Sequence, residues 1–162
     1  MDALWAPWRM EYIKGEKEAD CFLCRMLSED LDAENLVLHR GAECAVVMNR
    51  YPYNNGHLMV TPLRHLRHLR DLSAGEQAEL MAWTSRSVEI LREALNAEGF
   101  NVGLNLGKIA GAGLEEHLHI HIVPRWGGDT NFMPVLGETK VIPQALDDVY
   151  RELKPRFERT GD

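Results

Sequence analysis

Three of the seven histidines of this 162-residue chain lie within five positions, at His117, His119 and His121. An aliphatic residue separates each pair. This alternation is typical of a β-strand, in which the three imidazoles share one face while the intervening side chains enter a core. Alternate residues of a strand lie about 6.6 Å apart. The row is therefore close enough to act on one phosphate group or on one metal ion.

A second group with chemical potential is the pair Cys21 and Cys24, separated by two residues. The chain has three cysteines, an odd number that suits a reducing compartment better than a disulfide framework. The residues around the pair do not predict a strand that leads into a helix, so half of a metal site is favoured over a redox pair. Cys44 lies in an apolar segment, which predicts a buried thiol.

Length and composition predict one domain spanning residues 1–162, with an N-terminal docking arm at 1–20 and a C-terminal extension at 127–162. The hydrophobic content of 45% is enough for a sizeable core, and the net charge is −7. That charge argues against a nucleic acid polymer as partner, because such binding needs clustered Lys and Arg. No apolar run approaches the length of a membrane span, so we expect a cytoplasmic protein with no membrane partner.

The elements that must position the histidines follow from patterning. Short apolar segments, then one long amphipathic segment, then two further strands predict an α+β fold. We expect a five-stranded antiparallel sheet with one long helix and a C-terminal helix. The expected strands are Leu36–His39, Cys44–Met48, Gly56–Pro62, Phe100–Leu106 and the histidine segment; the expected helices are 74–97, with a capping box from Ser73 to Glu76 and an end at Gly99, and 143–158, starting at Pro143.

The histidine segment and its surroundings resemble the histidine triad family of nucleotidyl hydrolases and transferases. Residues 117–123 are similar to that family's signature, His-apolar-His-apolar-His-apolar-apolar. The resemblance covers about residues 20–126. Outside it, Leu4–Arg9 and Trp126–Met133 resemble a bacterial branch of diadenosine polyphosphate phosphorylases and hydrolases. Further matching residues occur in the family's order: Asn49-Arg50, Gly56-His57, Pro62 and Pro124-Arg125.

The resemblance implies a catalytic role for two of the histidines. His119 would attack an α-phosphorus to give a nucleotidyl-histidine intermediate, which water, phosphate or another acceptor then cleaves. A neutral imidazole is a capable nucleophile near pH 7, because its unperturbed pKa is about 6.5. His121 would contact the phosphate oxygens or the leaving group, where an N–H donor stabilises developing charge. The implied substrates are dinucleoside polyphosphates, such as diadenosine tetraphosphate, or nucleoside phosphoramidates.

The resemblance also implies residues that bind the nucleotide. Asn49 would bind the ribose hydroxyls, Asn105 would bind phosphate, and His57 would lie beneath the site as a supporting donor. The Gly-rich segment before the histidines suits a phosphate cradle, in which Gly111 and Gly113 let backbone N–H groups approach an anion. Many family members carry a glutamine where this chain has Gly113, and this difference leaves the identity of the leaving group open.

A structural zinc site is the third implication of the resemblance, with the ligands Cys21, Cys24, His65 and His117. Two thiolates and two imidazoles form a closed tetrahedral set, which leaves no open position for catalysis. His68 is the alternative to His65. No organic cofactor is expected. Family members commonly pair through the long helix and an edge strand, and a homodimer would protect an otherwise exposed edge.

Two other classes of function remain open at this point. In one, His117, His119 and His121 are ligands of a catalytic zinc ion in a hydrolase. The cysteine pair has no role in that hypothesis. In the other, the chain is a nucleotide-binding module with little turnover, which acts through partners.

Overall fold

The computed structural model describes residues 21–130 and 142–159. The predicted N-terminal arm at 1–20 lies outside the described residues, as does part of the extension at 127–162. No helix in the described ranges is long and apolar enough to cross a membrane. In chain order the elements are α2 (Phe22–Ser28), β1 (Val37–Arg40), β2 (Cys44–Met48), β3 (Leu58–Pro62), the 3-10 turn η1 (Leu69–Asp71), α3 (Ala74–Leu95), β4 (Gly99–Gly103), the 3-10 turn η2 (Lys108–Ala110), β5 (Ile120–Arg125) and α5 (Leu146–Glu158).

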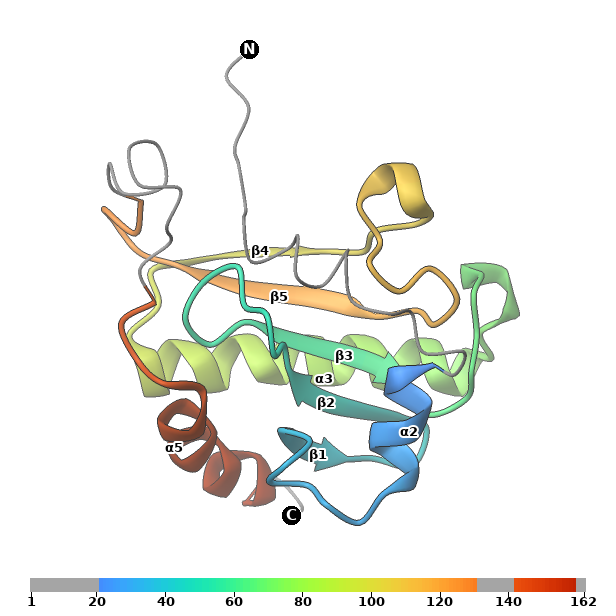
Figure 1. The fold of residues 1–162 in the computed structure, drawn as a ribbon, viewed down its shortest axis with the longest axis horizontal. Coiled ribbons are helices and arrows are strands. Elements are labelled where there is room, and N and C mark those ends of the chain that lie inside the picture. The colour runs from blue at the N-terminus through green and yellow to red at the C-terminus, as the bar shows by residue number, and fades with distance from the viewer. Residues whose placement is uncertain (1–20, 131–141, 160–162) are drawn as a thin grey trace.

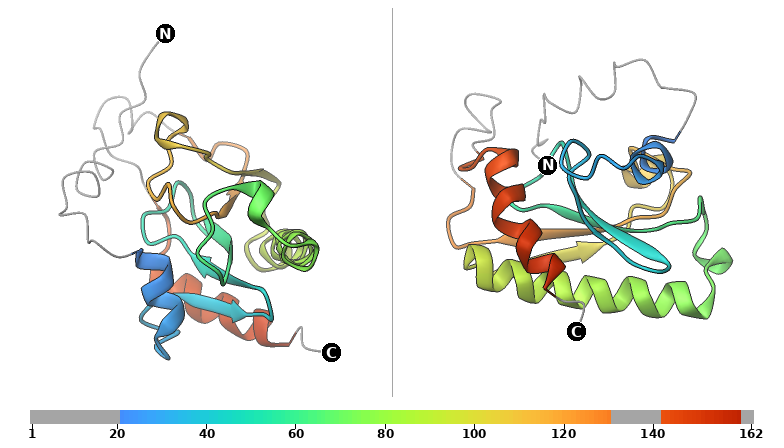
Figure 2. Two further views of the ribbon diagram at one scale, coloured as in Figure 1. Left: turned by 90° about the vertical axis from the view of Figure 1, so that its right-hand side faces the viewer. Right: turned by 90° about the horizontal axis from the view of Figure 1, so that it is seen from below.

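The five strands form one antiparallel sheet, as predicted, and their order in it is β1-β2-β3-β5-β4. Helices α3 and α5 pack on one face, and α2 packs on the other near β1 and β2 (Figures 1 and 2). Val46 and its neighbours on one face join the larger core with α3 and α5, whereas Val47 faces Leu23 of α2. Both faces of β2 are therefore covered, and this explains why all five of its residues are buried.

Helix α3 begins where the sequence predicts but ends earlier than expected. Ser73 is its N-cap and forms a reciprocal capping box with Glu76. At the other end Asn96 adopts a left-handed conformation with φ 51° and caps the helix. Gly99 was wrongly expected to end it and is instead the first residue of β4. Asparagine tolerates the left-handed conformation better than most residues, so no glycine is needed at the cap.

Other boundaries also differ from the predictions, by one residue in β1 and by two at the start of β3, which begins at Leu58 rather than Gly56. The paired part of the histidine strand starts only at Ile120, so His117 and His119 approach the sheet before the ladder begins. Strand β4 stops at Gly103 rather than at Leu106. Helix α5 begins at Leu146, three residues after Pro143. Helix α2 was not expected at all, because a seven-residue helix has too few turns to show a periodic pattern and lacks a side-chain cap.

The start of α3 supplies a prediction about acid stability. The Glu76 carboxylate is buried and accepts hydrogen bonds from Arg64 Nε and Nη2, both at 2.7 Å, and from the Ser73 N–H. These contacts, led by those of Arg64, lower the pKa of Glu76 from 4.5 to about 2. Ionised Glu76 thus stabilises the fold above pH 4.5, and this stabilisation is lost as the pH falls towards 2.

We expect Glu76→Gln to lower the free energy of unfolding at pH 7 by about 2 kcal/mol, the scale of a lost cap and charge-assisted hydrogen bonds. Urea denaturation at pH 7 and pH 3 measures the effect, and the difference between variant and wild type should narrow at the lower pH. The matched control is Glu89→Gln, whose exposed pair with Arg92 should change stability by less than about 0.5 kcal/mol. An equal loss at both pH values would contradict the prediction.

Candidate active site and metal centre

The candidate histidines meet where β5 lies between β3 and β4. In the sheet His121 pairs with Met59 of β3 and with Gly103 of β4, so its position is fixed from both sides. The ring centroids of His119 and His121 are 4.8 Å apart, and those of His57 and His121 are 5.1 Å apart. His57 comes from the loop that joins β2 to β3. Three predicted site residues from two segments are thus brought together.

His119 has the hydrogen bonding expected of a nucleophile. Its Nδ1 lies 2.8 Å from the carbonyl oxygen of His117. A carbonyl can only accept, so Nδ1 carries the hydrogen and the neutral ring has its lone pair on Nε2. Burial lowers the pKa of His119 below the ordinary 6.5, and the hydrogen bond to His117 opposes this only in part. The imidazole is therefore neutral near pH 7.

His121 carries its hydrogen on the nitrogen opposite to that of His119. This difference results from a series of hydrogen bonds that starts at a backbone N–H. The Tyr53 N–H donates to His57 Nδ1 at 3.0 Å. In neutral His57 the hydrogen is then on Nε2, which lies 2.9 Å from His121 Nδ1 and donates to it. Neutral His121 consequently carries its hydrogen on Nε2. The two neighbouring histidines, His119 and His121, thus offer a lone pair and an N–H donor at their Nε2 atoms.

Two asparagines that are predicted to bind the nucleotide lie at the two ends of this row of hydrogen-bonded histidines. Asn49 Nδ2 is 3.4 Å from His57 Nδ1, and Asn49 Oδ1 accepts from the Tyr51 N–H at 2.9 Å. The side-chain amide of Asn105 contacts His121 Nε2, with Nδ2 at 3.4 Å. Because Nε2 of neutral His121 carries a hydrogen, a hydrogen bond here requires a half-turn of the amide so that its oxygen accepts. Asn49, His57, His121 and Asn105 therefore form one continuous polar row. Asn49 also has a local role, since its side chain closes a turn in the loop.

The Gly-rich segment forms a compact turn. Gly107 and Gly111 have φ values of 86° and 88°, which favour glycine, and they flank η2. The N–H groups of Ala110 and Ala112 both donate to the Gly107 carbonyl, and the Gly111 N–H donates to Lys108. These three amides are used within the turn. A phosphate cradle here would have to rely on other amides of the segment, such as that of Gly113.

The four predicted zinc ligands, which include His117, form a cluster that contains neither His119 nor His121. Their ligand atoms all lie within 4.8 Å of one another. His117 Nδ1 is 3.3 Å from Cys21 Sγ and 3.4 Å from Cys24 Sγ, and His65 Nδ1 is 3.2 Å from Cys24 Sγ. A tetrahedral zinc ion would hold S and N ligands about 3.6 Å apart, so the donor set fits this ion.

The orientation of His117 suits a metal ligand. Its Nε2 donates to the Pro62 carbonyl at 2.8 Å, so the lone pair of the neutral ring is on Nδ1, which faces the thiols. Burial, followed by the neighbouring Cys21, raises the pKa of Cys24 to about 11. A bound cation would have to displace that thiol proton.

Two predicted alternatives do not match this geometry. His68 is the N-cap of η1 and is not part of the cluster, whereas His65 is. Within residues 21–130 and 142–159, the only group of side chains able to hold a metal contains neither His119 nor His121. The catalytic zinc hypothesis needs all three histidines around one ion, and the structure does not provide this arrangement.

Sequence reasoning missed three residues that contact the site or support it. The centroid of the Tyr53 ring lies 4.6 Å from the centroid of the His57 ring and 5.7 Å from that of the His121 ring. Asn54 and Asp129 are joined by a 2.8 Å hydrogen bond that connects the loop of His57 to the turn after β5. Asp129 belongs to the segment that resembles the bacterial branch, and this was its only signal in the sequence.

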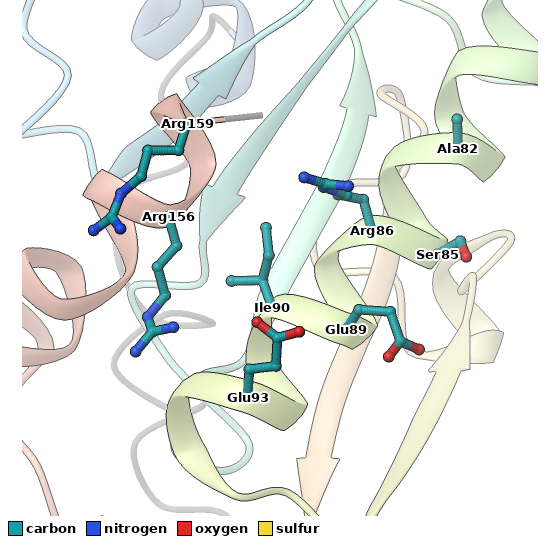
Figure 3. A pocket seen from close by; sticks show the side chains of 8 residues that line it. All are labelled: Ala82, Ser85, Arg86, Glu89, Ile90, Glu93, Arg156 and Arg159. Carbon is teal, nitrogen blue, oxygen red and sulfur yellow. The ribbon is translucent and has the colours of Figure 1, made fainter. Parts of the chain in front are cut away.

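A groove of about 540 Å³ lies between α3 and α5 and is drawn in Figure 3. Ile90 contributes to its lining, and charged side chains such as Arg86, Glu93 and Arg156 surround it. None of the predicted catalytic, nucleotide-binding or metal-binding residues lines this groove. The candidate site is therefore defined by the histidine geometry and not by this hollow.

Comparison with known proteins agrees with this geometry. A model of the HIT domain matches residues 31–128. The AP-4-A phosphorylase of Mycobacterium tuberculosis is 44% identical over 98% of this chain and 86% of its own length. The asymmetrical bis(5'-nucleosyl)-tetraphosphatase of Schizosaccharomyces pombe is 30% identical over 57% of this chain and 50% of its own. A crystal structure of a Zn-bound histidine triad family protein from Mycobacterium smegmatis superposes with a TM-score of 0.69 and 26% identity, covering 86% of this chain and 94% of that one.

Proposed function

Because this chain belongs to the histidine triad (HIT) family, we propose that it is a nucleotidyl hydrolase or transferase. It would cleave dinucleoside polyphosphates at an α-phosphate, through a nucleotidyl-histidine intermediate. The observation that carries the proposal is the 2.8 Å hydrogen bond from His119 Nδ1 to the His117 carbonyl, which gives Nε2 the lone pair. The names of the relatives from M. tuberculosis and S. pombe support the substrate class. Nucleoside phosphoramidates are the second candidate substrates, since they carry the same α-phosphorus.

In the first step, His119 Nε2 attacks the α-phosphorus and forms a P–N bond. The bond from that phosphorus to the bridging oxygen breaks, and the remaining nucleotide leaves with both electrons on oxygen. His121 Nε2–H donates to a phosphate oxygen or to the leaving oxygen as negative charge grows there. A donor positioned in advance for that charge contributes on the order of 10²- to 10³-fold to the rate.

In the second step, an acceptor attacks the same phosphorus and breaks the P–N bond, which returns the electron pair to His119. Water as acceptor yields a nucleoside monophosphate, whereas inorganic phosphate yields a nucleoside diphosphate. The relative's name, AP-4-A phosphorylase, supports phosphate as the acceptor. The His117 carbonyl holds the His119 ring in one orientation through both steps.

We assign the nucleotide to the polar row around His121. Asn105, 3.4 Å from His121 Nε2, would contact the phosphate, and Asn49 would bind the ribose hydroxyls. His57 supports His121 from beneath. Gly111 and Gly113 would border the phosphates through the backbone, with the Gly113 amide as donor because that of Gly111 is used in the turn.

Cys21, Cys24, His65 and His117 would hold a structural zinc ion. The ion would join α2 to the segment before β5, and it supplies no open coordination position for catalysis. The similar histidine triad family protein from M. smegmatis is Zn-bound in its crystal structure, and this supports zinc as the metal. We propose that the reaction requires no organic cofactor.

We further propose that the chain is a single catalytic domain that acts as a cytoplasmic homodimer. β4 is an edge strand, and the side chains of Val102 on β4 and Met81 on α3 are 48% and 61% exposed. Pairing of two copies through these elements would cover the edge.

A substrate panel tests the proposed function. Diadenosine tetraphosphate and adenosine phosphoramidate are each incubated with the protein, with and without inorganic phosphate, and the products are separated by ion exchange. We expect cleavage of the tetraphosphate, with ADP formed when phosphate is present. Mass spectrometry of protein quenched during turnover should detect one nucleotide on the peptide containing His119. Cleavage without this adduct, or no cleavage of either substrate, would overturn the proposal.

A further inference from the structure

The loop that carries His57 is fixed by two buried asparagines. Asn54 Nδ2 donates to the Pro124 carbonyl at 3.0 Å and to Asp129 Oδ2 at 2.8 Å. The neighbouring Asn55 Nδ2 lies 2.5 Å from Gln144 Oε1, in the segment before α5. The two asparagines are only 5% and 6% exposed, although they lie in a loop. The loop between β2 and β3 is thus attached to a part of the chain about 70 residues away.

Asp129 is the centre of this attachment. Its carboxylate, 7% exposed, accepts from Arg125 Nε at 2.5 Å, from Arg125 Nη2 at 2.9 Å and from the Trp126 N–H. Arg125 also donates to Asn101 Oδ1 of β4 at 2.8 Å. The Arg125 guanidinium holds the pKa of Asp129 at about 2, so the carboxylate is ionised at any working pH. We call Asn54, Arg125 and Asp129 the loop clamp.

The loop clamp is adjacent in sequence to Tyr53. The backbone N–H of Tyr53 determines which ring nitrogen of His57, and through it of His121, carries a hydrogen. Asn54 directly follows Tyr53, whose N–H donates to His57 Nδ1. The Asn54 carbonyl in turn accepts from the His57 N–H at 3.2 Å. Fixing the Asn54 side chain therefore fixes the direction of the Tyr53 N–H relative to the imidazole of His57.

We propose that Asp129 and Asn54 are positioning residues that keep the N–H of His121 directed at the phosphate, by holding the Tyr53 N–H on His57 Nδ1. This inference rests on the proposed function, which gives His121 its role as donor. With the loop clamp intact, His57 donates from Nε2 to His121 Nδ1, and His121 keeps its hydrogen on Nε2.

If the loop clamp is loosened, His57 and His121 can each adopt the other tautomer, with the hydrogen on Nδ1 instead of Nε2. Without the Tyr53 N–H, His57 Nδ1 keeps the longer 3.4 Å contact from Asn49 Nδ2 as a weaker donor. The Nδ1 tautomer of His57 then becomes more accessible, and its Nε2 accepts from His121 Nδ1–H. The His121 Nε2 lone pair would then face the phosphate oxygens and repel them. A fraction of the molecules would lose the donor that matters in the transition state, so kcat should fall while KM changes little.

The test uses the full-length protein with Asp129→Asn, which keeps the shape of the side chain and removes its charge. A second variant, Asn54→Ser, shortens the donor from the other side, and it decides the question if Asp129→Asn does not fold. The matched control is Asp148→Asn, the same change at an exposed ion pair on α5. Two properties are measured: kinetics with diadenosine tetraphosphate at a temperature well below unfolding, and the imidazole ¹⁵N shifts of His57 and His121, which distinguish the two tautomers.

For both clamp variants we expect kcat to fall about tenfold with KM within about twofold, because only transition-state stabilisation is removed. The ¹⁵N shifts should reveal the Nδ1 tautomer of His57, which is absent from the wild type and from Asp148→Asn. Wild-type kcat in a folded clamp variant, or lowered kcat with unchanged His57 and His121 tautomers, would overturn the inference. The tautomers are read without substrate, so a failure of the proposed function, seen as no His119 adduct in the wild type, is distinguishable from a failure of the loop clamp.

Discussion

Replacement of His119 by glycine should lower turnover of diadenosine tetraphosphate by on the order of 10⁴-fold or more, the expected scale for removing a nucleophile. The variant lacks the Nε2 lone pair that the His117 carbonyl sets up, and no other imidazole in the site has that polarity. Binding of a nucleoside monophosphate should stay within about threefold of wild type, since in the proposed mechanism His119 contacts only the reacting phosphorus. Rapid-quench kinetics and calorimetric titration measure the two properties.

His68→Gly is the matched control for this variant, because it makes the same change at an exposed histidine outside the site. Its turnover should equal that of the wild type. Circular dichroism checks that His119→Gly is folded, because loss of a buried side chain costs stability whatever its role. Normal turnover in the folded His119→Gly variant would contradict the mechanism. Loss of nucleotide binding together with turnover would point to a role in binding.

Removal of zinc is the second large effect that we expect. The purified protein should contain about one zinc ion per chain, as expected for a closed four-ligand site. A chelator, or Cys24→Ser, should lower the free energy of unfolding by about 4 kcal/mol if the ion is present at a thousandfold its Kd. Cys24 belongs to α2 and His117 to the segment before β5, so the ion would join parts of the chain that lie 93 residues apart. Metal analysis and thermal unfolding measure the loss.

Two histidine variants make this zinc test specific. His65→Ala should lower zinc affinity and stability, whereas His68→Ala should change neither, because only His65 belongs to the cluster. The same experiment addresses the catalytic zinc hypothesis. If metal-stripped protein that is still folded forms no His119 adduct, while added zinc restores it, the ion is close to the chemistry and the structural assignment is wrong. We expect the adduct to form without metal, at a reduced rate.

The reduced rate follows from the two roles of residue 117. Its imidazole belongs to the cluster of four proposed zinc ligands, and its backbone carbonyl accepts the hydrogen bond from His119 Nδ1. Movement of the imidazole after metal loss would therefore disturb the carbonyl that orients His119, the proposed nucleophile. This coupling is invisible in the sequence, because the side chain and the backbone of one residue act in different sites.

Patterns with a short range in the chain were predicted well. The β2 segment Cys44–Met48 and the capping box at Ser73 and Glu76 are found as expected, since both depend on neighbouring residues. The cluster of Cys21, Cys24, His65 and His117 was implied by resemblance, and the structure brings these residues together. Predictions of element ends were less accurate. Asn96 caps α3 instead of Gly99, and β5 starts after His119, because caps and ladder ends depend on contacts across the fold.

The sequence by itself determined the chemical types and their order: three alternating histidines, a cysteine pair, and the α+β arrangement that carries them. Only the tertiary structure decided how the three imidazoles differ. His117 faces the thiols because its Nε2 donates to Pro62, His119 is oriented by the carbonyl of His117, and His121 takes its polarity from His57 and Tyr53. The position of a hydrogen on an imidazole depends on which donor or acceptor lies opposite each nitrogen. For His117 and His121, those partners come from distant segments that only folding brings together.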